Sequence, residues 1–264
     1  MKKLAFILAL LLPVAAQAQT TATVAGRASA GVDYKISKGL HIKAEEEIRS
    51  GDGFSSLGSL RSTLELTYKP VKYFKVGVGY TLINPWKTSW NAFNAPRHRA
   101  SLDATGYLPL GDFQLYLKER LQLTHRTGDF NVYQTTPNAL ALKSRIGVKY
   151  KGWRAVKPSA YFEVRTALND PWGTTSGSVQ YKKDGTSYYN YTPAGYTHVY
   201  NNRYRGSIGL DWDITKQHTL SPYVLLDYVS EYEIDANSAG TRLFSAANNN
   251  YFRVSLGIGY TFSF

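Results

Sequence analysis

The stretch that decides the fold lies at the end of the chain, where residues 252–262 read FRVSLGIGYTF. Every second residue from Phe252 to Phe262 is apolar or aromatic, and the residues between them are Arg, Ser, Gly, Gly and Thr. Side chains of a β-strand alternate between its two faces, so this pattern predicts a strand with one apolar and one polar face. A helix would instead repeat its apolar residues every three to four positions.

The same alternation recurs along the chain and predicts eleven strands, at approximately 24–36, 39–49, 59–69, 73–83, 97–108, 113–126, 139–150, 157–168, 203–214, 219–233 and 250–263. Most of these segments are ten residues or longer. A strand of a soluble protein has about 5–6 residues, whereas a tilted strand that crosses a membrane needs about 9–11. The lengths therefore favour a membrane-spanning barrel over a soluble β-sandwich.

The connections between these segments fall into two alternating classes. The short ones are 37–39, 69–72, 109–112, 151–156 and 215–218, and the longer ones are 50–58, 84–96, 127–138, 169–202 and 234–249. Short turns at one end and long loops at the other are typical of outer-membrane barrels. We therefore predict an all-β fold: a transmembrane antiparallel β-barrel of about 10–12 strands with short periplasmic turns and longer extracellular loops.

The strand count itself raises a question, because bacterial single-chain barrels normally have an even number of strands. If Phe264 lies on the periplasmic side, counting back places the start of segment 24–36 on the outer side. Three explanations are possible. The segment passes through the lumen, it is not part of the wall, or an additional strand lies within 169–202. The Asp184-Gly185 pair predicts a hairpin there, but a hairpin adds two strands and keeps the count odd.

Residues 1–18 have the organisation of a secretory signal peptide. Lys2 and Lys3 precede an apolar run over 4–14, and Ala16-Gln17-Ala18 fits a cleavage site. We expect cleavage near Ala18, leaving residues 19–264 as one β-barrel domain in the outer membrane of a Gram-negative cell. The chain has no cysteine, which excludes a disulfide scaffold, a catalytic thiol and a lipoprotein anchor.

Several segments occur in an order that points to a known family: EEEIR at 45–49, YKP at 68–70, FKVGVGY at 74–80, RHR at 97–99, KERLQ at 118–122 and GIGY at 257–260. In this order the sequence resembles the Bacteroidota outer-membrane barrels known as domain of unknown function 2490. The resemblance covers most of the predicted barrel and implies its fold and its location. It implies no activity, so function has to be inferred from the residues.

The polar faces of the strands carry more basic than acidic side chains, and arginines gather toward the predicted outer mouth. We name as candidate lumen-lining residues Glu45, Glu47, Arg49, Arg61, Arg97, Arg99, Arg120, Arg145, Glu163, Arg165, Arg203, Arg205 and Arg253. Two interpretations of this arginine collar stay open. In the first, Arg97, Arg99, Arg203 and Arg205 hold Glu45, Glu47 and Glu163 in a ladder that fills the barrel. In the second, the collar is an anion-selective constriction.

The expected function is a non-enzymatic, porin-like barrel that forms a narrow anion-preferring channel; the alternative is an outer-membrane enzyme of the lipid-hydrolase or protease type. The five histidines show no informative spacing to a serine and an acid, nor to one another, so no catalytic, cofactor-binding or metal-binding residue is assigned. Expected partners are outer-membrane lipid, small anionic solutes, and the assembly machinery that would recognise the terminal strand ending at Phe264. No nucleic acid is expected.

Two acidic residues do not fit the pattern. Glu46 and Glu119 fall on the apolar face, each between apolar neighbours. A charge that faces lipid is costly. We therefore expect a local bulge at each position that turns the carboxylate inward.

Overall fold

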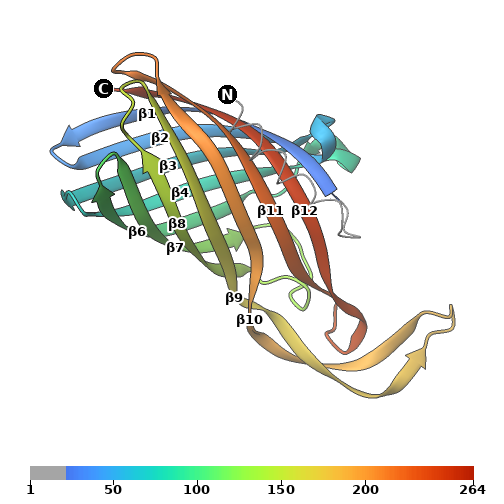
Figure 1. The fold of residues 1–264 in the computed structure, drawn as a ribbon. Helices are drawn as coiled ribbons and strands as arrows, with labels where there is room; N and C mark the ends of the chain where they lie inside the picture. Colours follow the sequence, from blue (N-terminus) through green and yellow to red (C-terminus); the bar gives the residue numbers. More distant parts are fainter. Residues whose placement is uncertain (1–21) are drawn as a thin grey trace.

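The computed structural model describes residues 22–264, which form a closed barrel with one long projection (Figure 1). The predicted signal peptide and its cleavage near Ala18 lie outside the described residues. Within residues 22–264 no helix is long and apolar enough to cross a membrane.

Eleven long strands make the wall: β1 (Ala22–Ser37), β2 (Leu40–Ser50), β3 (Leu57–Val71), β4 (Phe74–Lys87), β6 (Arg97–Leu110), β7 (Phe113–Arg126), β8 (Asn138–Tyr150), β9 (Val156–Tyr181), β10 (Ser187–Asp213), β11 (His218–Ala236) and β12 (Arg242–Ser263). The connections hold two 3-10 turns, η2 (Asp52–Phe54) and η3 (Thr88–Trp90), and the two-residue strand β5 (Ala92–Phe93), which pairs with β4 outside the wall. All eleven predicted strands are present, so the all-β class and the barrel are confirmed.

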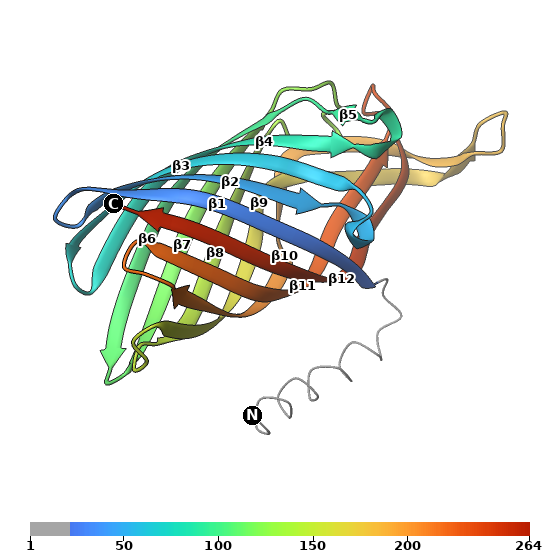
Figure 2. The same cartoon turned by 90° about the horizontal axis from the view of Figure 1, so that it is seen from above.

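The barrel closes through a parallel seam, which explains the odd count. β1 pairs with β12 in parallel, from Ala22 opposite Phe252 to Asp33 opposite Ser263, whereas the other neighbours in the ring are antiparallel. Figure 2 shows β1 lying between β2 and β12. Segment 24–36 is therefore a wall strand, and it is the single departure from the predicted antiparallel pairing. The parallel partner follows from the odd count, since the first and last strands then run the same way.

The two ends of the barrel differ as predicted. One end, the turn rim, carries the connections 38–39, 72–73, 111–112, 151–155 and 214–217, and the other, the loop rim, carries 51–56, 88–96, 127–137, 182–186 and 237–241. The end of the chain lies at the turn rim, where the backbone N–H of Phe264 donates to the carbonyl of Asp33 at 3.0 Å.

Residues 169–202 and 234–249 are not the long loops that we predicted. β9 and β10 continue through the first segment as a hairpin that projects from the loop rim, and β11 and β12 continue into the second (Figure 1). The predicted turn at Asp184-Gly185 is confirmed, but it joins two wall strands and adds none. Pro193 and Gly195 lie where the β9–β10 register shifts, and such bulges tolerate both residue types.

The outer face of the wall is a continuous apolar belt. Its exposed members include Ile48, Leu64, Val78, Leu102, Leu117, Ile146, Phe162, Ile208, Val224 and Leu256, one from each strand from β2 to β12. Soluble monomers rarely expose a contiguous apolar surface of this extent, whereas a barrel in a membrane requires it.

Glu46 and Glu119 stay on this outer face, so the predicted bulges are wrong. The pairing of β2 with β3 is unbroken around Glu46, and that of β7 with β8 is unbroken throughout. Ser62, directly opposite Glu46, donates to its carboxylate at 2.9 Å, and Ser144 does the same for Glu119 at 2.6 Å. A bulge would disturb the register of every residue beyond it, and a cross-strand hydroxyl satisfies a carboxylate oxygen without that disturbance.

Replacing Glu46 or Glu119 by leucine is expected to stabilise the barrel in lipid. Both lie near mid-strand on the lipid-facing side, where an acid costs less than the about 2–4 kcal/mol of a base, so a gain of about 1–2 kcal/mol is expected. Urea unfolding in phospholipid vesicles measures it. Glu45→Leu, on the opposite face and paired with Lys43, is the control and should give no gain. Unchanged midpoints for both outer-face variants would contradict this explanation.

Candidate functional site

The thirteen candidate residues lie on the strand positions that alternate with the apolar belt, and hence on the lumen side of the wall. The pairing of the strands brings them, with further charged residues, into rows that cross several strands. Two of these rows run next to each other through β7, β8, β9 and β10 and differ in their order of charge.

The first, the alternating row, places opposite charges next to each other. Across neighbouring strands it consists of Arg253, Asp227, Arg205, Glu163, Arg145 and Lys118. Oppositely charged residues that face each other across a strand pair are stabilising. Up to Arg145, this row therefore has the charge order of a structural ladder.

Its two carboxylates are the most deeply buried acids within residues 22–264. Arg205 binds Asp227 with both arms of its guanidinium, at 2.5 and 2.8 Å, and Arg27 of β1 approaches the same carboxylate to 3.9 Å. Glu163 accepts from Arg145 at 2.6 Å and from Arg203 at 2.9 Å. The exposed fractions are 1% for Asp227 and 2% for Glu163, so each carboxylate is held by two arginines in place of water.

The second, the cationic row, contains four basic residues on four successive strands: Arg203 faces Arg165, Arg165 faces Lys143, and Lys143 faces Arg120. Its two ends reach carboxylates, because Arg203 binds Glu163, and Arg120 binds Asp103. Lys143 and Arg165, in the middle, belong to none of the ion pairs formed within residues 22–264. Lys143 and Arg120 also line a cavity of about 80 Å³ whose one acidic lining residue is Glu163.

The predicted ladder among Arg97, Arg99, Arg203 and Arg205 forms only in part. Arg203 holds Glu163, but Glu45 and Glu47 are bound by Lys43 and Arg49, which lie two residues away on their own strand. Arg205 binds Asp227 instead. Arg99 donates to the hydroxyl of Thr124 at 2.9 Å, and Arg97 lies directly opposite Arg126. The collar is therefore a ladder on one side and a set of cations without acidic partners on the other.

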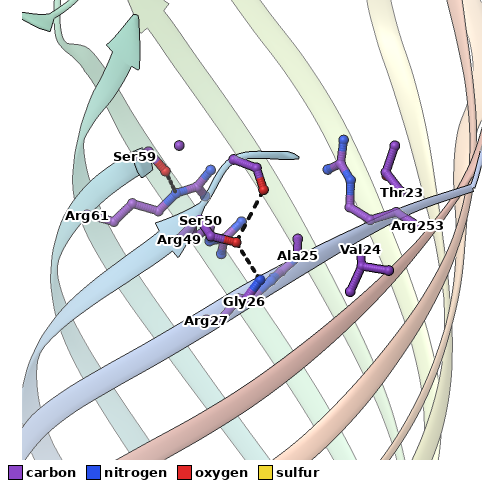
Figure 3. A pocket seen from close by; sticks show the side chains of 12 residues that line it. Thr23, Val24, Ala25, Gly26, Arg27, Arg49, Ser50, Ser59, Arg61 and Arg253 are labelled. Carbon is purple, nitrogen blue, oxygen red and sulfur yellow. Dashed lines mark hydrogen bonds between the residues drawn. The ribbon is translucent and has the colours of Figure 1, made fainter. Parts of the chain in front are cut away.

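A pocket beside the parallel seam is lined by four arginines. Arg27, Arg49, Arg61 and Arg253 line a cavity of about 200 Å³ near the loop rim. Figure 3 shows Arg49 and Arg61 entering from one side of this four-arginine pocket and Arg253 from the other. Arg27 and Arg49 face each other directly in the β1–β2 pairing.

Nearer the turn rim the lumen is crossed by ion pairs. Arg120 of β7 reaches Glu65 of β3, three strands farther around the wall, at 3.4 Å. Lys149 binds Asp211 across β9, and Lys157 binds Asp213 on the neighbouring strand. These contacts pair most of the charges in the part of the lumen near the turn rim, here called the lower lumen, so the unpaired positive charge is concentrated toward the loop rim.

Three important residues were missed as candidates. Arg27 was left out because the position of segment 24–36 was open, although Arg27, Ser29 and Gly31 follow the same alternation as the other lumen faces. Lys143 and Asp227 fall on the polar faces of their predicted strands, but nothing in the sequence indicates that Lys143 is unpaired or that Asp227 is buried. Those properties depend on the pairing register.

The histidine contacts bear on the enzyme alternative. Four rings have polar partners: His41 with Asp33 at 3.0 Å, His98 with Tyr80 at 2.6 Å, His125 with Asn138 at 2.8 Å, and His218 with Tyr260 at 2.7 Å. The fifth, His198, packs between aromatic rings of the projection. A hydrolytic triad needs the imidazole to bond a nucleophilic hydroxyl as well as an acid. The partners of these four rings are an acid, an amide and two phenols.

A family model described as "Protein of unknown function (DUF2490)" matches residues 28–183, from β1 through the end of β9. The chain belongs to this family. The match to DUF2490 confirms the predicted resemblance and includes the central part of the cationic row. No curated protein matches the chain. Among solved structures, the "Outer-membrane expressed OmpT of Vibrio cholerae" is similar with a TM-score of 0.33 and 9% identity, over 81% of this chain and 64% of that chain. The DUF2490 chain thus spans less than two thirds of that protein.

Proposed function

We propose that this protein is an outer-membrane channel of a Gram-negative bacterium that prefers small anions. The cationic row carries this proposal. Like charges that face each other across a strand pair are destabilising, by amounts comparable to the about 0.2–1 kcal/mol gained from opposite charges. Arg203, Arg165, Lys143 and Arg120 make three such pairs in succession.

The neighbouring alternating row shows that the fold does not require this arrangement. On the same strands, Arg205, Glu163 and Arg145 place an acid between two bases. A glutamate at the position of Arg165 would give the cationic row the same order of charge. An unfavourable charge arrangement that a single residue would relieve is best explained by a role that needs the positive charge.

That role follows from electrostatics in a confined space. Fixed positive charges in a narrow, low-dielectric wall raise the local concentration of anions and oppose the entry of cations. Arg165 and Lys143 are the cations of the row that form no ion pair within the described chain, and they lie on the loop-rim side of the neutral lower lumen. A small anion entering from outside would meet them before it reaches the neutral lower lumen.

The test is the ion selectivity of the purified protein in a planar bilayer. With unequal potassium chloride on the two sides, the reversal potential of the unchanged protein should report anion preference. Lys143→Gln combined with Arg165→Gln should lower the chloride-to-potassium permeability ratio several-fold, because the two unneutralised charges are gone. The barrel should still fold, since neither residue makes an ion pair within residues 22–264.

Lys183→Gln combined with Lys216→Gln is the matched control. It removes the same charge from the exposed hairpin turn and the exposed turn rim and should leave the permeability ratio unchanged. A folded protein without conductance, or a selectivity that the lumen variant does not alter, would refute the channel.

A further inference from the structure

The four-arginine pocket has the chemistry of a phosphate-binding site. We infer that it binds a phosphate group, of inorganic phosphate or of a small phosphate ester, on its way through the lumen. The inference rests on the proposed function, because it names a solute class for the same channel. It depends on a different set of residues from the cationic row.

The charge of the pocket is only partly neutralised. Arg49 binds Glu47, and Arg27 lies 3.9 Å from Asp227, a carboxylate that Arg205 already holds with both arms. The hydrogen bonds of the other two arginines go to neutral oxygens. Arg61 donates to the hydroxyl of Ser59 at 3.3 Å, and Arg253 donates to the phenol of Tyr251 at 3.0 Å.

Each guanidinium has five N–H donors in a planar fork that fits two oxygens of one anion. Arg61 and Arg253 therefore keep most of their donors available. Arg61 faces Glu47 and Arg253 faces Asp227 across their strand pairs, but neither forms an ion pair within residues 22–264. Four arginines around these two carboxylates suit a ligand of about two negative charges with several oxygens. A phosphate group meets both conditions, whereas chloride offers one charge and no oxygen.

The pocket also has a suitable size and position. Its volume of about 200 Å³ corresponds to several water molecules at about 30 Å³ each, which is enough for a phosphate or a small phosphate ester. Its lining includes Thr23, Ser50 and Gly58, which stand at the loop-rim ends of β1, β2 and β3. A solute that enters from the loop rim can therefore reach it.

The parallel seam builds this site. Arg253 is brought beside β1 because Thr23 faces it in the β1–β12 pairing, and Arg27 is brought beside β2 because it faces Arg49. β1, the strand that makes the count odd, thus contributes Arg27 to the pocket and positions Arg253 beside it.

Titration calorimetry of the purified protein in a detergent without phosphate tests the inference. Inorganic phosphate and glycerol phosphate should each bind saturably, with a dissociation constant of about 1 mM or tighter, against a background of chloride. Arg61→Gln combined with Arg253→Gln should weaken phosphate binding at least about tenfold. Arg97→Gln combined with Arg126→Gln, which removes two lumen charges outside the pocket, should leave the affinity within about twofold.

Several outcomes would overturn the assignment. These are the absence of saturable phosphate binding to the unchanged protein, equal weakening by both double variants, or tighter binding of succinate than of phosphate. Repeating the titration in phospholipid nanodiscs distinguishes the source of the phosphate group. Loss of binding there would mean that lipid headgroups occupy the pocket, and that free phosphate is not its ligand.

This test is separate from the test of the channel. Phosphate binding without anion-selective current would refute the proposed channel, whereas the proposed phosphate site would stand. Anion-selective current without phosphate binding would refute the phosphate site, whereas the proposed channel would stand.

Discussion

Replacing Glu163 by glutamine is expected to lower the free energy of unfolding of the barrel by about 3–5 kcal/mol. The carboxylate is 2% exposed and bridges Arg145 and Arg203. Glutamine has nearly the same shape, so the variant removes a charge without opening a cavity. The two partly buried arginines would lose their counter-charge close to the unpaired Lys143 and Arg165, and that is the source of the large effect.

Guanidinium unfolding of the protein in lipid vesicles measures this loss. Glu45→Gln is the matched control, because it makes the same chemical change in an ion pair with Lys43 that is far more exposed. Its expected cost is about 0–1 kcal/mol. If the two variants unfold at the same denaturant concentration, Glu163 does not hold the wall together and the alternating row is not a structural ladder.

The class of fold was accessible from the sequence because alternation is a local property. Every predicted strand is present, and a period of two fixes which residues, such as Arg99 and Glu163, share the face opposite the apolar belt once a strand is recognised. The predicted segregation of the connections between the rims also appears in the structure. These features require no knowledge of which strand pairs with which.

The features that failed depend on neighbours in space. Segment 24–36 could not be placed because its partner, β12, lies at the other end of the chain and runs parallel to it. The predicted strands stop at 168 and resume at 203, which predicted a long loop over 169–202, but β9 and β10 continue through it with register shifts at Pro193 and Gly195. At Glu46, the cost of a lipid-facing charge favoured a bulge, and the serine opposite it became visible only with the register.

The candidate site shows the same division. Composition revealed an excess of basic side chains in the lumen, but it left a ladder and a constriction as alternatives. The register separates them. Moving by two residues along β9 changes a ladder position, Glu163, into an unpaired cation, Arg165. The ladder describes the alternating row, and the constriction is what we propose for the cationic row. Variants in the two rows should therefore have opposite effects on stability.

Lys143→Glu is the variant that uses this contrast most directly. It places a carboxylate between Arg165 and Arg120 and leaves one like-charge contact in the cationic row, that of Arg203 with Arg165. Stability should rise, by about 1 kcal/mol or more, because two like-charge contacts become attractive. Selectivity should at the same time fall sharply or turn toward cations, because the charge of the lumen near its outer mouth drops by two.

Reversal potentials and denaturant unfolding on one preparation measure both effects. Lys183→Glu makes the same change on the exposed hairpin turn and should alter neither. A gain in stability with unchanged selectivity would mean that the cationic row lies outside the conduction path. A loss of stability would mean that the row is not repulsive in the folded protein, and the argument from charge order would fail. A more stable barrel that no longer prefers anions is the result that ties the unfavourable row to transport, because it shows that the positive charge at this position serves permeation at the expense of stability.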